Sequence, residues 1–125
     1  MVKIYKCSIC GNILIKLEDK SEALACCGEK MELLEVKDKD GAFEKHVPVV
    51  EKEEIDGGFK VNVKVGSIMH PMEAEHFIHF VLVETENGYD IKFLKPGEEP
   101  EVNFLVNEDL KAVYEYCNLH GLWKA

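Results

Sequence analysis

The sequence contains no apolar run of the roughly 20 residues that a membrane-spanning helix needs. Its first residues, MVKIYKCSIC, also lack the charged and then apolar layout of a secretory signal. Neither an internal repeat nor a low-complexity segment is apparent in the rest of the chain. We therefore expect a globular protein that does not enter a membrane and that is cytoplasmic.

Positive charge is scarce as well. Lysine and arginine together number 15 against 24 acidic residues, which gives a formal net charge of −9. Because no basic stripe is available to neutralise phosphates, nucleic acid is excluded as a partner. The 125 residues are 46% apolar and 31% charged, as is ordinary for a globular protein with one modest core and a small appendage.

Four of the five cysteines lie near the N-terminus. Cys7 and Cys10 form a C-x-x-C pair, Cys26 and Cys27 are adjacent, and each pair is followed by a glycine. In a reducing compartment, clustered cysteines bind metals or do redox chemistry more often than they form disulfides. Two consecutive ligands require a bent backbone. We predict a four-thiolate metal site, and because tetrahedral sulfur sites take zinc or iron, the spacing leaves the metal open.

The composition changes near Glu35, where the cysteine-rich segment gives way to the charged stretch VKDKDG. This stretch is typical of a linker or tight turn, so we predict domains of residues 1–36 and 37–125. The first is too small to be held together by core burial alone. Four thiolates on one metal ion would stabilise it.

The second domain has the pattern of short strands. Valines alternate with polar residues in FKVNVKVG, and apolar segments at 77–84, 88–94, 101–106 and 111–117 are separated by turn residues. The last of these also fits helical spacing. We predict a mainly β protein, in which the small metal-binding domain precedes an immunoglobulin-like antiparallel β-sandwich.

Five histidines and the isolated Cys117 are candidates for a second site. Taken singly, most histidines are surface or core residues. Several of these, however, lie in settings typical of strand ends and loops, such as His70 before Pro71 and His120 before Gly121. Four imidazoles and one thiolate would leave one position of an octahedral ion vacant for inner-sphere chemistry. Zinc prefers four ligands and has no redox step, so this mixed set favours iron.

The motifs resemble a known family. CSICGN and CCGEKM are similar to desulforedoxin and to the N-terminal domain of desulfoferrodoxin, which implies a rubredoxin-like iron. EKHVPVV, HPMEAEHFIHF and CNLHGLW are similar to the three signature segments of the superoxide reductase domain. The whole chain thus resembles two-iron desulfoferrodoxin. The resemblance implies that the second, catalytic iron is held by His46, His70, His76, Cys117 and His120.

The resemblance also implies an activity. Ferrous iron with an open sixth position would reduce superoxide by one electron to hydrogen peroxide, and a rubredoxin-type donor would then reduce the iron again. Lys45 would steer superoxide and assist protonation, whereas Glu44 would occupy the sixth position of the oxidised iron. His79 falls outside the ligand set and is expected to be structural. Both modules resemble domains that pair about a two-fold axis, so a homodimer is expected.

Three other interpretations are open. An electron carrier or redox sensor would need a second site closed to external ligands. A binding module with a β-sandwich that is stabilised by zinc would use its acidic surface to bind a partner. Cys117 and His120 could form a nucleophile and base, although neither an orienting acid nor an oxyanion hole is evident in the sequence.

Overall fold

The computed structural model describes residues 2–38 and 43–125, apart from the side chains of residues 43 and 44. The chain divides between Glu35 and Val36 into two compact units. None of the helices in the described part of the chain is long and apolar enough to span a bilayer.

The N-terminal unit is built from very short strands. Strands β2 (Ile13–Ile15), β1 (Ile4–Lys6) and β5 (Glu32–Leu33) form one small sheet in that order, and β3 (Ala25–Cys26) and β4 (Glu29–Lys30) form a hairpin. Tyr5, Cys7 and Met31 form a small buried cluster in this unit. One member of that cluster is a predicted metal ligand, which fits a unit that needs more than apolar burial.

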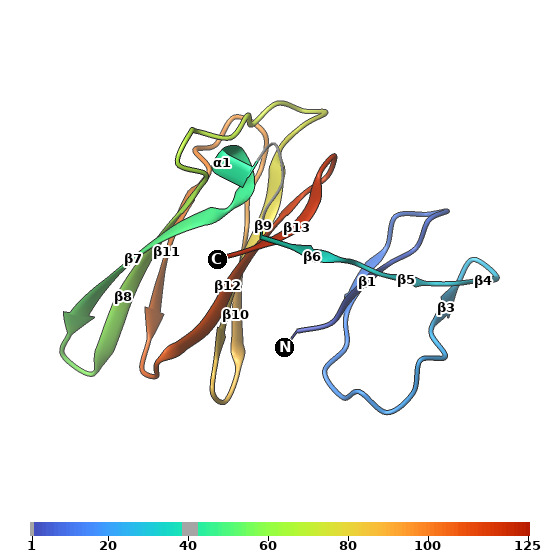
Figure 1. The fold of residues 1–125 in the computed structure, drawn as a ribbon, viewed down its shortest axis with the longest axis horizontal. Helices are drawn as coiled ribbons and strands as arrows, with labels where there is room; N and C mark the ends of the chain where they lie inside the picture. The colour runs from blue at the N-terminus through green and yellow to red at the C-terminus, as the bar shows by residue number, and fades with distance from the viewer. Residues whose placement is uncertain (1, 39–42) are drawn as a thin grey trace. The chain divides into compact units, whose positions relative to one another are not determined.

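The C-terminal unit consists of two sheets (Figure 1). One contains β10 (Tyr89–Phe93), β9 (Ile78–Thr85), β12 (Leu110–Cys117), β13 (Gly121–Lys124) and β6 (Val36–Lys37), in that order. The other contains β11 (Glu101–Val106), β8 (Gly58–Val65) and β7 (Pro48–Ile55). Neighbouring strands are antiparallel except for β6, which pairs parallel with β13.

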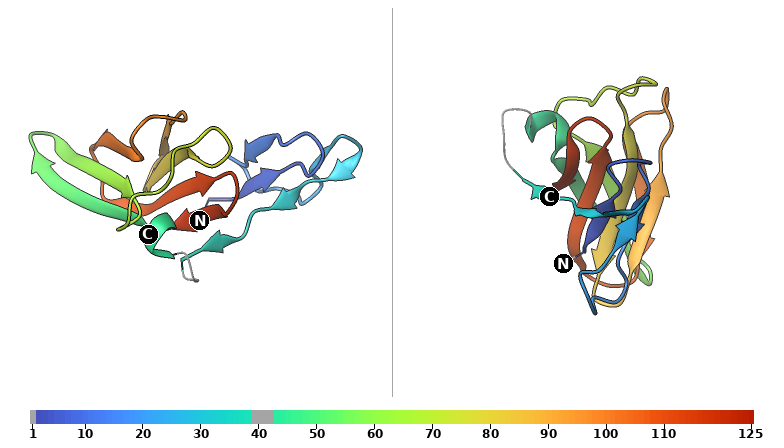
Figure 2. Two further views of the ribbon diagram at one scale, coloured as in Figure 1. Left: turned by 90° about the horizontal axis from the view of Figure 1, so that it is seen from above. Right: turned by 90° about the vertical axis from the view of Figure 1, so that its right-hand side faces the viewer.

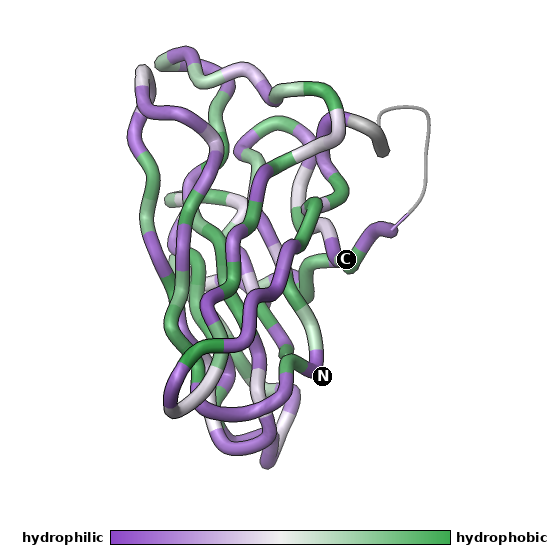
Figure 3. The backbone as a smooth tube through the Cα atoms, turned by 90° about the vertical axis from the view of Figure 1, so that its left-hand side faces the viewer, coloured by the Kyte–Doolittle hydropathy of each residue, from purple (hydrophilic) through white to green (hydrophobic). Residues whose placement is uncertain are grey.

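Alternation of side chains explains why the two sheets pack together. Val61, Val63 and Val65 of β8 are buried, whereas the intervening residues of the strand are not. These valines join Val83 and Val113 of the other sheet in one hydrophobic core. The same alternation of hydrophobic and hydrophilic residues runs along the backbone in Figure 3. A period of two is what a strand with one buried face requires.

One short helix, α1 (Phe43–His46), precedes β7. It lies beside β13 in both views of Figure 2, and the ring of His46 stacks on that of Trp123, 4.8 Å between centroids. Helix α1, the loop between β8 and β9 and the turn between β12 and β13 lie at the same end of the sandwich (Figure 1). This end carries all the predicted ligands of the second site.

The predicted fold class is confirmed: the protein is mainly β, with a small cysteine-rich unit before an antiparallel β-sandwich. Residues 110–117, where the sequence also allowed a helix, form strand β12. The stretch VKDKDG, residues 36–41, was expected to be a linker or tight turn, but Val36 and Lys37 pair with Leu122 and Trp123 as strand β6. Residues 39–41 lie outside the described residues. The domain limits of 1–36 and 37–125 remain a prediction.

The packing can be tested with two valines on neighbouring strands. Val63 of β8 is fully buried, whereas Val49 of β7 is 37% exposed on the other face of its sheet. Val63→Ala should lower the free energy of unfolding by about 2 kcal/mol, from lost transfer energy plus a cavity. Val49→Ala should change it by less than about 0.5 kcal/mol. Chemical unfolding of the C-terminal unit measures both, and equal effects would contradict the assigned core.

Candidate metal centres

Four cysteine sulfurs converge in the N-terminal unit. The Sγ atoms of Cys7, Cys10, Cys26 and Cys27 all lie within 4.8 Å of one another, and all four are free thiols. Cys10 Sγ lies 3.6 Å from Cys26 Sγ, and Cys26 Sγ lies 3.9 Å from Cys27 Sγ. A tetrahedron with metal–sulfur bonds of about 2.3 Å has edges of about 3.8 Å, so these spacings fit a four-sulfur metal site.

The backbone bends where adjacent ligands require it. Cys27 has a φ of 54°, a left-handed conformation that is uncommon outside glycine, and Gly28 follows with a φ of 76°. This turn joins β3 to β4 and directs both sulfurs of the adjacent pair to one point. The bent backbone predicted for two consecutive ligands is therefore present.

The surroundings of the sulfurs favour bound thiolates. Backbone N–H groups of Cys10 and Ile9 lower the pKa of Cys7 to about 6. The sulfurs of Cys10, Cys26 and Cys7 raise the pKa of Cys27 to about 12. Four thiolates this close repel one another unless a cation lies among them. The residues present therefore fit a metal ion.

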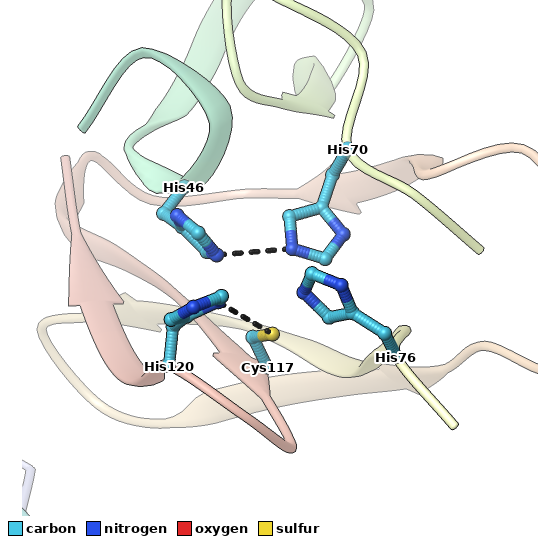
Figure 4. A group of neighbouring side chains, drawn as sticks. All are labelled: His46, His70, His76, Cys117 and His120. Carbon is cyan, nitrogen blue, oxygen red and sulfur yellow. Dashed lines mark hydrogen bonds between the residues drawn. The ribbon is translucent and has the colours of Figure 1, made fainter. Parts of the chain in front are cut away.

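A second cluster lies in the C-terminal unit (Figure 4). Ligand atoms of four histidines and one cysteine all lie within 4.8 Å of one another: His46, His70, His76, Cys117 and His120. Helix α1 supplies the first, the β8–β9 loop the next two, the end of β12 the thiol, and the β12–β13 turn the last. These are the five residues named from the sequence as ligands of the second iron.

The four imidazoles form a closed ring of edge-to-face contacts. Centroid distances are 4.6 Å from His46 to His70, 4.7 Å from His70 to His76, 5.1 Å from His76 to His120 and 4.7 Å from His120 to His46. Cys117 Sγ lies 3.9 Å from His120 Nδ1. Each ring contacts its two neighbours, so all four surround one common point.

The nitrogens facing that point carry lone pairs. His70 Nδ1 lies 2.6 Å from the Pro71 carbonyl oxygen and donates to it, which leaves Nε2 as a free acceptor 3.0 Å from His46 Nε2. Burial lowers the pKa of His70 to about 4 and also lowers that of His76, so both rings are neutral near pH 7. His76 Nε2 is buried without a hydrogen-bond partner among the described residues. A metal ion would satisfy it.

The thiol of Cys117 has a raised pKa, in contrast to the lowered pKa of the buried imidazoles. Cys117 is fully buried, and burial raises its pKa, although the N–H groups of His120 and Leu119 oppose the shift. A buried thiolate needs a neighbouring cation. The raised pKa argues against the Cys117–His120 nucleophile, which would need an activated thiol. A metal ligand is the role that fits.

Two residues that the sequence did not single out bring the ligand loops together. Asn118 accepts a hydrogen bond from the Phe77 N–H at 3.1 Å and donates one to the Glu75 carbonyl at 2.8 Å, so it binds both neighbours of His76. Gly66 has a φ of 84°, and a Cβ there would lie 2.6 Å from the Lys45 carbonyl oxygen. Only glycine allows the chain to approach the backbone beside His46 so closely.

The remaining candidates lie around this cluster. Lys45, directly before His46, is exposed, and its charge is felt at His76, where it contributes to the lowered pKa. The side chain of Glu44 lies outside the described residues. His79 is absent from the cluster and stacks on Phe77 at 4.0 Å between ring centroids, which fits its expected structural role.

Both parts of the chain match models of known protein families. The family model described as desulfoferrodoxin matches residues 38–125, and the model of the desulfoferrodoxin N-terminal domain matches residues 1–34. The chain belongs to the desulfoferrodoxin family. The resemblance seen in the sequence is thereby confirmed, including the desulforedoxin-like N-terminal unit.

Several relatives match this chain over nearly its whole length. A desulfoferrodoxin homolog of Archaeoglobus fulgidus is 46% identical and covers 100% of this chain and 97% of its own. The desulfoferrodoxin of Nitratidesulfovibrio vulgaris is 48% identical over 98% and 94% of the two chains. The crystal structure of the superoxide reductase from Treponema pallidum superposes with a TM-score of 0.79, at 34% identity, over 100% and 97%.

The role of Asn118 in this family member gives a test. Asn118→Ala removes both side-chain hydrogen bonds that join the loop of His76 to the turn of Cys117 and His120. Metal affinity of the second cluster should fall by about 10- to 100-fold, as is usual when a group that orients ligands is lost. Competition with a chelator measures it, with the four-cysteine cluster as internal reference.

Asn103→Ala is the matched control, because Asn103 lies on β11 and accepts a hydrogen bond from Asn62 of β8, and neither residue belongs to a cluster. Its metal affinity should equal that of the unaltered protein. If Asn118→Ala binds metal at the second cluster as tightly as the unaltered protein, Asn118 does not position the ligand loops.

Proposed function

We propose that this chain is a superoxide reductase with two irons, one held by the four cysteines and one by the four histidines and Cys117. The reaction consumes one superoxide, one electron and two protons and yields one hydrogen peroxide. The observation that carries the proposal is the convergence of five donor atoms of that composition, all within 4.8 Å of one another.

The donor set favours iron at the second site. Structural zinc takes four ligands, whereas this cluster offers five of mixed nitrogen and sulfur character. Five ligands leave one position of an octahedral ion without a protein donor. An iron bound there would supply the single electron and the point of attachment for the anion.

The charge of the site suits an anionic substrate despite the net charge of −9. Imidazoles bind a metal in their neutral form, so four of them add no charge, and one thiolate on a divalent ion leaves a local charge of +1. Charges farther away than about 8 Å are largely screened at physiological salt. The local positive charge therefore governs the final approach of superoxide, and the distant acidic residues mainly lower its capture from afar.

Lys45 is the side chain best placed to extend this attraction. It is exposed in the last turn of α1, next to His46, and its charge acts on His76 on the other side of the ring of imidazoles. We assign it the capture of superoxide and assistance in protonation. Glu44, its neighbour in α1, is proposed to bind the oxidised centre after turnover.

The electron is replaced after each turnover by a one-electron donor of the rubredoxin type. We propose no obligatory relay of that electron through the four-cysteine iron, since the second cluster has all five of its ligand residues within the C-terminal unit. A homodimer in the cytoplasm is the proposed state of the protein. These assignments rest on the family resemblance alone.

The reaction itself gives the main test. The pre-reduced protein is mixed with superoxide under anaerobic conditions, and peroxide and dioxygen are measured together. One peroxide should form for each electron drawn from the protein, without dioxygen, because the anion is reduced and not dismutated. Dioxygen released in step with peroxide would contradict the proposal.

His120→Ala should abolish the reduction of superoxide and the binding of the second iron, and it should leave the four-cysteine iron bound. Metal analysis of the purified variant measures both irons.

The role of Lys45 is tested by Lys45→Ala. Loss of the charge should slow superoxide capture roughly 10-fold at low ionic strength and flatten its dependence on salt. Pulse radiolysis over a range of salt concentrations measures the rate. Lys60→Ala removes an exposed lysine from β8 and should leave the rate unchanged. Equal rates for the two variants would remove the steering role.

A further inference from the structure

The carbonyl group of ligand His120 is held by two donors. Lys37 Nζ and Trp123 Nε1 each lie 3.1 Å from its oxygen. A carbonyl oxygen has two lone pairs, so both are used. These bonds anchor the turn that carries Cys117 and His120, and they come from strands β6 and β13.

Lys37 and Trp123 also contact each other. They are paired residues of the parallel strands β6 and β13, and the ammonium lies 5.6 Å from the centroid of the indole ring. A lysine within about 6 Å of a tryptophan ring is attracted to its face. The register of the two strands therefore places a cation on the indole.

The indole of Trp123 also contacts a second ligand residue, His46. Trp123 is fully buried, and its ring lies nearly parallel to that of His46, at an interplanar angle of 15°. Lys37 thus acts on His120 through a hydrogen bond and on His46 through the stacked indole. One lysine and one tryptophan outside the ligand set thus hold the backbone of one ligand residue and the ring of another.

The charge of Lys37 has its own consequence. A positive charge close to a metal centre favours the less positive oxidation state, and low-dielectric surroundings strengthen the effect. Trp123 is fully buried, whereas Lys37 is half-buried and the turn is exposed at Leu119 and His120, so solvent partly screens the charge and its effect is limited to a several-fold shift. Ferrous iron is the state that the proposed reaction consumes.

We propose that Lys37 is a positioning residue of the second metal centre, which holds His120 and Trp123 in place and adds a charge that favours the ferrous state. This rests on the proposed iron at that centre. It assigns a function to strand β6, which lies in a stretch that the sequence indicated only as a linker or tight turn.

The test compares three variants of the full-length protein with both irons bound. Lys37→Met removes the charge and keeps most of the side-chain length, and Lys37→Arg keeps the charge and the donor. Lys60→Met removes an exposed lysine on β8 and controls for the change in net charge. Optical redox titration follows both irons in the same molecule, and a chelator challenge follows the release of each.

At the midpoint potential of the unaltered second centre, Lys37→Met should show a several-fold higher ratio of ferric to ferrous iron. It should also release that iron several-fold faster, while the four-cysteine centre stays unchanged. Lys37→Arg and Lys60→Met should behave as the unaltered protein. If Lys37→Met loses only the second iron and Lys37→Arg retains it, the positioning role is supported as well.

Three results would overturn the proposal: Lys37→Met equal to the unaltered protein, the same shift in Lys60→Met, or loss of both irons from Lys37→Met. The titration needs no superoxide, so the two proposals can fail separately. An unaltered protein that does not reduce superoxide contradicts the proposed function, whatever Lys37 does. One that reduces superoxide while Lys37→Met matches its potential contradicts only the role of Lys37.

Discussion

Donor atoms that converge without a cation repel one another or bury unsatisfied lone pairs, and both side-chain clusters depend on this constraint. In the N-terminal unit the neighbouring sulfurs push the pKa of Cys27 to about 12. In the C-terminal unit burial raises the pKa of Cys117 and lowers that of His70 to about 4. A raised pKa of the thiol and a lowered pKa of the imidazole both keep these side chains uncharged. A bound metal ion stabilises the thiolate and accepts the lone pair of the neutral imidazole.

The two units meet this constraint from different starting points. The buried cluster of the N-terminal unit is small and includes Cys7, itself a ligand, so metal binding and folding are closely linked there. The sandwich has an extensive core of its own, in which valines from both sheets pack together. Its ligands are placed on a short helix, a loop and a turn at one end of that rigid core, where function is usually carried.

Five strands of the sandwich could be predicted from the sequence, because their apolar residues alternate, as in β8 and β11, or run nearly without a break, as in β9 and β12. Strands β7 and β13 were not assigned from the sequence. Alternating valines in β8 and turn residues such as Asn87-Gly88 locate strands to within a residue or two. Strand β6 was missed because Val36 and Lys37 are too few to show a period, and their partner β13 is far away in sequence. The choice between helix and strand at 110–117 depended on pairing with β9, which a local pattern does not contain.

The two metal clusters could also be predicted only in part from the sequence. Cysteine spacing and the motifs around the histidines indicated which residues belong together, because ligand types and spacings are local. The groups that orient the ligands are not local: Asn118 acts on the residues beside His76, and Lys37 acts on His120. Their roles depend on contacts between segments that only the folded chain brings together: Asn118 lies within the segment CNLHGLW but its partners do not, and Lys37 lies outside every motif.

The central claim is that four imidazoles and one thiolate share a single iron. The most direct measurement is anomalous X-ray scattering from crystals of the protein, recorded above and below the iron absorption edge. Two iron peaks per chain are expected, one among the four cysteine sulfurs and one in contact with His46, His70, His76, Cys117 and His120. A second peak of the same height above and below the iron edge, as zinc would give, or an iron bound to fewer of these five residues, would contradict the account.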